Sequence, residues 1–133
     1  MKRSLIVLLF TALLSGCAGL GMATVGAVMY YKSQSHEVAT VDIKAPANKV
    51  YNKAVDIVSN NPEIDIIQQD DTLMLLDINQ DDTAATIKIS QINRQVSQLT
   101  ISADARENDG ASRVLDGVFR ICKELKVECK LSE

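Results

Sequence analysis

The sequence lacks tryptophan, has only two phenylalanines and three tyrosines among its 133 residues, and contains a single histidine, His36. A core with so few aromatic side chains must be built from Val, Ile, Leu, Met and Ala. A single imidazole at the edge of the folded part argues against a Ser-His-Asp or Cys-His catalytic arrangement. We therefore expect a protein that is not an enzyme and has no catalytic residues, and we interpret His36 as a solvated residue at the start of a strand.

Clusters of basic residues are also missing, and the formal net charge is −3. Binding to phosphate backbones requires clustered Lys and Arg, so we expect no nucleic-acid partner. A polybasic patch for a membrane surface is absent as well. The sequence has no Gly-rich phosphate loop and no Cys-x-x-Cys pair, and we therefore expect no cofactor and no metal site.

One segment resembles the opening of an EF-hand calcium loop, with Asp77, Asn79 and Asp81 at alternate positions. Asp82 stands where the loop needs its turn glycine, and Lys88 stands where it needs the bidentate glutamate. A surface hairpin with solvated carboxylates is the better interpretation.

The amino terminus has the organisation of a bacterial lipoprotein signal. A short apolar run, Leu5–Leu14, follows Met1-Lys2-Arg3 and has the length of a signal-peptide core, too short to span a bilayer. It ends in Leu14-Ser15-Gly16-Cys17, where small residues precede a thiol as in a lipobox. We predict that residues 1–16 are a cleaved signal peptide and that Cys17 is lipidated. The alternatives are an ordinary signal peptide with an incidental cysteine, or an uncleaved anchor.

Lipidation at Cys17 implies a place in the bacterial cell envelope, with the membrane as a partner. One acyl chain holds a protein only marginally, so the two or three chains of a lipoprotein cysteine make a lasting anchor. Ala18 follows Cys17 where an inner-membrane retention signal would have Asp. The expected localisation in a Gram-negative cell is therefore the outer membrane, facing the periplasm.

Residues 17–35 are predicted to tether the anchor to a folded domain. The stretch from Ala18 to Tyr31 is apolar and rich in glycine. As a helix it would extend ~21 Å at about 1.5 Å per residue, short of a hydrocarbon core of about 30 Å. Gly19, Ala23 and Ala27 would then place small side chains on one helix face, as in packed membrane helices. A flexible apolar spacer is the equal alternative.

Residues 36–133 have the pattern of one small α+β domain. Alternation at 39–44 predicts a strand, and apolar residues at helical spacing from Pro46 to Val58 predict a helix. Four strands joined by short polar turns are expected at 64–69, 72–79, 83–92 and 96–105. A second helix from residue 111 or 112 and a last short strand at 127–131 follow. We predict a two-layer domain of order β-α-β-β-β-β-α-β, with a mainly antiparallel sheet of five to six strands and both helices on one face.

The chain resembles a family of small bacterial lipoproteins whose domain has no assigned function. The resemblance rests on the lipobox, the Gly/Ala-rich segment ending in Tyr30-Tyr31-Lys32, and Ala45-Pro46-Ala47-Asn48-Lys49-Val50-Tyr51. It implies a location and a fold and carries no catalytic residues. The paired cysteines of this chain are not typical of that family.

Cys122 and Cys129 remain once Cys17 is assigned to lipid. A pair of cysteines in an oxidising compartment usually forms a disulfide. A continuous helix would hold their Cα atoms about 10.5 Å apart, beyond the limit of about 7 Å for a bridge. A helix break around Lys126 would let Cys129 fold back beneath Cys122, and we predict a disulfide; two buried reduced thiols are the alternative.

Two functional classes stay open. The first is a non-catalytic envelope lipoprotein that binds another envelope component through its open sheet face or an edge strand. Its support is a polar outward face, formed by Thr86, Lys88, Ser90, Gln98, Thr100 and Ser102. The alternative is a carrier of a small apolar ligand, which needs a cavity in a core otherwise filled by aliphatic side chains. A hydrolase is a third class and requires a pocket that holds two polar groups within hydrogen-bond reach.

Overall fold

The computed structural model describes residues 25–104 and 112–132. The strands are β1 (Ala27–Lys32), β2 (His36–Ile43), β3 (Ile64–Asp70), β4 (Leu75–Gln80), β5 (Thr83–Gln91), β6 (Ser97–Asp104) and β7 (Lys130–Leu131). The helices are α2 (Ala47–Ser59) and α3 (Arg113–Glu124). Within these residues the strands form one seven-stranded sheet in the order β3-β4-β5-β6-β2-β1-β7.

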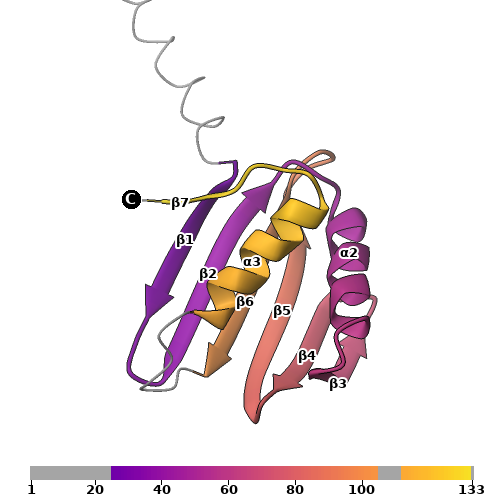
Figure 1. Ribbon diagram of the computed structural model, residues 1–133. Helices are drawn as coiled ribbons and strands as arrows, with labels where there is room; N and C mark the ends of the chain where they lie inside the picture. The colour runs from indigo at the N-terminus through magenta and orange to yellow at the C-terminus, as the bar shows by residue number, and fades with distance from the viewer. Residues whose placement is uncertain (1–24, 105–111, 133) are drawn as a thin grey trace, which may run out of the picture.

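The predicted α+β class is confirmed, with a mainly antiparallel sheet and two helices. Both helices lie on the same face of the sheet (Figure 1). Among the pairs of strands in the described residues, only that of β1 and β7 is parallel. The predicted five to six strands and the predicted element order were wrong, because the sheet has a seventh strand that the sequence did not reveal.

The additional strand is β1, which lies within the segment predicted as a tether. Val28 and Tyr30 face the helices, while Met29 and Tyr31 face outward and are each 68% exposed. Successive side chains of β1 therefore alternate between the two faces of the sheet, but they do not alternate between apolar and polar. A search for alternating apolar and polar residues could not detect this strand. For residues 27–32 the tether prediction, as spacer or helix, was wrong. The earlier part of that segment lies outside the described residues.

The turns between strands follow the sequence in one place and depart from it in another. Asp81 and Asp82 form a two-residue turn with positive φ at both positions, as a type I′ hairpin requires. The predicted two-residue turn at Asp70-Asp71 was wrong, because β4 begins only at Leu75. There Asp70 accepts hydrogen bonds from the N–H groups of Thr72 and Leu73 and holds a longer turn.

The core lies between the sheet and the two helices. Each helix buries one stripe at three- and four-residue spacing, as the sequence predicts. The buried residues are Ala47, Val50, Tyr51, Ala54 and Val58 of α2, and Val114, Val118, Ile121 and Cys122 of α3. The predicted polar face is confirmed by the register, in which Thr86, Lys88 and Ser90 pair with Ser102, Thr100 and Gln98.

The C-terminal strand closes the sheet next to the start of the described chain (Figure 1). Lys130 donates its N–H to the Gly26 carbonyl at 2.8 Å. Gly26 has φ +85°, and a Cβ atom there would lie 2.5 Å from the Glu128 carbonyl oxygen. Only glycine fits this close approach without a shift of the backbone.

Candidate functional site

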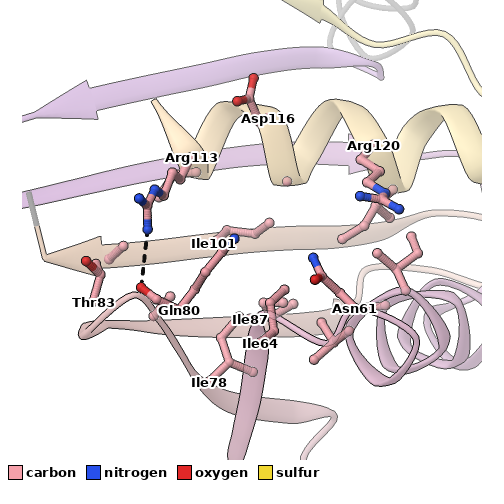
Figure 2. Close-up of a pocket in the computed structure, with 18 residues that line it drawn as sticks. Asn61, Ile64, Ile78, Gln80, Thr83, Ile87, Ile101, Arg113, Asp116 and Arg120 are labelled. Carbon is pink, nitrogen blue, oxygen red and sulfur yellow. Dashed lines mark hydrogen bonds between the residues drawn. The ribbon is translucent and has the colours of Figure 1, made fainter. Parts of the chain in front are cut away.

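A groove of about 210 Å³ lies between α2 and α3 above the sheet. Its floor is apolar, from Ile64, Ile78, Ala85, Ile87, Ile101 and Ala103 of β3 to β6. Its walls are Ala54, Ile57, Val58 and Asn61 from the α2 side, and Val114, Asp116, Gly117 and Ile121 from α3. Gln80, Thr83, Arg113 and Arg120 complete the lining, so polar groups stand at the margins of an apolar floor (Figure 2).

Small residues explain why this part of the core is open. Ala85 of β5 lies directly opposite Ala103 of β6, so the sheet has two methyl groups where larger side chains would fill the space. Gly117 allows α3 to lie close to the sheet, since a Cβ atom there would be 3.1 Å from Ile101 Cδ1. The groove therefore results from small residues in the sequence and from the strand register that places Ala85 opposite Ala103.

One end of the groove is closed by Arg113. Its Nη1 atom donates to the Gln80 carbonyl oxygen at 3.2 Å (Figure 2). Its Nη2 atom lies 3.2 Å from Asp81 Oδ2. The Thr83 hydroxyl, which also belongs to the lining, is buried and has no hydrogen-bond partner in the described part of the chain. The guanidinium and the backbone carbonyl are within hydrogen-bond reach, but they provide neither a nucleophile nor a general base.

The other end carries Arg120 of α3 and Asn61, which follows the C-terminus of α2 (Figure 2). Arg120 makes no ion pair within residues 25–104 and 112–132. Asn61 Oδ1 accepts the Glu63 N–H at 3.0 Å. The groups left to interact at this end of the groove are the Arg120 guanidinium and the Asn61 Nδ2 group, and both are hydrogen-bond donors.

The sequence-predicted site residues lie away from the groove or outside the described residues. Cys17 belongs to the latter group. His36 begins β2, and its Nδ1 atom lies 3.9 Å from Asp104 Oδ1 between two exposed side chains. That distance exceeds a hydrogen bond, so the pair is at most a weak surface ion pair. Within the described residues no group of three His, Cys, Asp or Glu side chains could hold a metal ion.

The structure joins Cys122 of α3 to Cys129, which precedes β7, by a disulfide with Cα atoms 6.2 Å apart. The helix break predicted around Lys126 is confirmed, since α3 ends at Glu124 and Lys126 has φ 58°. Neither cysteine of the bridge belongs to the groove lining. It therefore has no direct part in the candidate site.

Three side chains with shifted pKa values also lie outside the groove. Burial and a 2.6 Å hydrogen bond to Asp71 raise the pKa of Tyr51 to about 12. The same bond, with one from Gln69, lowers the pKa of Asp71. Burial is the main cause of the raised pKa of Tyr30, which donates to Glu37 at 2.8 Å. The shifts arise from burial and from hydrogen bonds within the fold, and they indicate structural roles.

Sequence reasoning missed the groove residues because their meaning depends on strand register. Ala85 and Ala103 are unremarkable alanines until the two strands are paired. Arg113 and Arg120 are seven positions apart in the sequence, a spacing that brings two side chains near the same face of a helix. That spacing was the only available signal for the polar ends of the groove.

The described part of the chain has no helix that is both long and apolar enough to cross a bilayer. No family model and no curated protein matches the sequence. Among solved structures, the chain is similar to the crystal structure of the Zhui aromatase/cyclase from Streptomyces sp. R1128. The TM-score is 0.43 with 13% sequence identity, over 68% of this chain and 86% of that chain. A similarity at this level carries no inference about function.

Proposed function

We propose that the chain is a lipid-anchored envelope protein whose domain binds a small ligand with an apolar body in the groove between α2 and α3. The observation that carries the proposal is an apolar floor of isoleucine and alanine bounded by polar side chains. Ligand sites are typically concave, mostly apolar and equipped with a few polar groups, with volumes of roughly 300–1,000 Å³. This groove, at about 210 Å³, suits a small ligand or one that is partly enclosed.

Filling the groove with a larger side chain tests whether it binds a ligand. Ala85→Leu adds a larger side chain to the floor, while Ala84→Leu adds the same side chain at the exposed neighbouring position of β5. We expect small molecules that copurify with the full chain from cell envelopes, measured by mass spectrometry, to fall about tenfold or more for Ala85→Leu only. Circular dichroism verifies that both variants fold. Identical mass-spectrometry profiles for the original chain, Ala85→Leu and Ala84→Leu would reject the ligand-binding function.

The anchor is proposed from the lipobox alone, and a separate experiment addresses it. Cys17→Ser removes the thiol that accepts the lipid, so we expect an uncleaved, unlipidated precursor. Metabolic labelling with a fatty-acid probe should mark the original chain and leave the variant unmarked. Equal labelling of both would reject the assignment.

A second candidate function, binding of an envelope protein, is favoured by the position of β3 at the edge of the sheet that the described strands form. This strand ends the sheet, and Ile67 is 67% exposed along it. Unpaired edge strands can pair with a partner. We expect Ile67→Lys to abolish crosslinking to such a partner, while Leu131→Lys on β7, at the opposite edge, retains it. Unchanged crosslinking in both variants would exclude this mode.

A further inference from the structure

The two polar ends of the groove differ in their charge balance. At one end Arg113 is already paired with Asp81, so its positive charge has a built-in counterpart. At the other end Arg120 makes no ion pair in the described part of the chain. Asp116, one helical turn before Arg120, also lines the groove, but it makes no ion pair with Arg120, and its carboxylate points away from Arg120 and Asn61 (Figure 2). Within the described residues the cation at the Arg120 end of the groove therefore has no ion-pair partner.

Asn61 adds a donor of fixed orientation at that end. A backbone N–H can donate only to the oxygen of an amide, so the bond from the Glu63 N–H fixes which atom of Asn61 is Oδ1. Its Nδ2 group makes no hydrogen bond within the described residues and is left to donate. Figure 2 shows Asn61 and Arg120 on opposite sides of the same end of the groove.

We propose that the ligand is an apolar organic acid, with its carboxylate between Arg120 and Asn61 and its apolar body along the isoleucine floor. This inference rests on the proposed ligand-binding function and names the class of ligand. A guanidinium forms charge-assisted hydrogen bonds with carboxylate oxygens, and an amide N–H₂ can donate to the same group. The floor between the two ends is formed by Ile64, Ile87 and Ile101 (Figure 2).

Two features set the charge that this end can hold. The C-terminus of α2 is near Asn61 and contributes about half a negative elementary charge, which opposes an anion. Arg120 carries a full positive charge, which exceeds this partial negative charge. The two contributions leave about half a positive charge, so a singly charged carboxylate fits better than a doubly charged phosphate.

The test compares ligands that share a chain length and differ in the headgroup. Octanoate, octanol and octyl phosphate are titrated near neutral pH into the full chain in lipid nanodiscs, with empty nanodiscs as the blank, by isothermal titration calorimetry. We expect octanoate to bind about tenfold or more tightly than octanol. Arg120→Gln should remove this preference, while Lys123→Gln, which removes an exposed charge from the same helix outside the groove, should retain it.

Asn61→Asp provides a second variant that retains the turn, because an aspartate oxygen can still accept the Glu63 N–H. It replaces the free donor with an acceptor and adds a negative charge, so octanoate affinity should fall while octanol affinity stays the same. Equal binding of octanoate and octanol, or tighter binding of octyl phosphate, would overturn the carboxylate assignment and leave the ligand-binding function standing. Failure of all three ligands to bind would overturn both.

Discussion

Lys126 has a backbone conformation that its side chain disfavours. The N–H of Val127 bonds to the Cys122 carbonyl, and the N–H of Lys126 bonds to the Lys123 carbonyl. This is the Schellman pattern that ends many helices, and Lys126 occupies the position where glycine is usual. The left-handed conformation costs a non-glycine residue roughly 1–2 kcal/mol.

We therefore predict that Lys126→Gly stabilises the protein. The relief of strain exceeds the entropy lost by a glycine on folding, and the net gain should be about 0.5–1 kcal/mol. Lys123→Gly, inside the last turn of α3, is the matched control and should destabilise by up to about 1 kcal/mol. Urea unfolding measures both changes. A loss of stability in Lys126→Gly would contradict the strain argument.

At the scale of elements, Glu37 connects β1, β2 and α3 through a buried carboxylate. It accepts hydrogen bonds from the hydroxyls of Tyr30 at 2.8 Å and Ser112 at 3.3 Å. The Ser112 hydroxyl in turn accepts the Leu115 N–H as the N-cap of α3. One side chain thus orients the helix cap over the first two strands of the sheet.

Loss of this carboxylate should loosen the attachment of α3 to the sheet. We predict that Glu37→Ala lowers the free energy of unfolding by about 1–3 kcal/mol, because two hydroxyls lose their acceptor inside the fold. Glu37→Gln retains an acceptor oxygen and should lose less. Thr40→Ala on the outward side of β2 is the control. Thermal melts compare the three, and equal effects of Glu37→Ala and Thr40→Ala would contradict the proposed connection.

The helices, and strands β3, β5 and β6 within one residue of their predicted bounds, followed from the sequence because apolar periodicity directly reports which face is buried. The case of β1 marks the limit, since Met29 and Tyr31 are apolar and yet exposed. The longer turn before Leu75 marks another, because Asp70 folds back on its own backbone. The groove could not be predicted, since it depends on the pairing of Ala85 with Ala103.

Across the whole molecule, a Tyr51–Asp71 hydrogen bond links α2 to the turn between β3 and β4 and makes stability depend on pH. The Tyr51 pKa is raised from 10.0 to about 12, so the stabilisation is present below pH 10 and is lost as pH rises through about 12. The Asp71 pKa is lowered from 3.8, so its stabilisation is present above that pH and is lost as pH falls further.

The alkaline part of this dependence can be isolated by substitution. Tyr51→Phe should show a smaller loss of stability between pH 10 and about 12 than Tyr31→Phe, whose ring is exposed. Some loss should remain in Tyr51→Phe, because the pKa of Tyr30 is also raised. The midpoints of urea unfolding across this pH range measure the loss of stability in both variants. Parallel curves for the two variants would show that Tyr51 makes no such contribution.

The C-terminal segment is attached to the rest of the molecule at two levels, by the disulfide to α3 and by the pairing of β7 with β1. If the chain is exported as proposed, the bridge forms in an oxidising compartment, and we predict no free thiol in protein from cell envelopes after denaturing alkylation. Cys129→Ser should lower the stability by about 2 kcal/mol, because the bridge closes a loop with a sequence separation of only 7.

The loss of stability in Cys129→Ser should be confined to the β1–β7 end of the sheet. Hydrogen exchange should therefore rise at Lys130 and Ser132, whose N–H groups bond to Gly26 and Val28, and stay unchanged in β4 and β5. Complete alkylation of both cysteines in envelope protein, or an unchanged melting temperature in Cys129→Ser, would mean that packing of β7 on β1 holds the segment without the bridge.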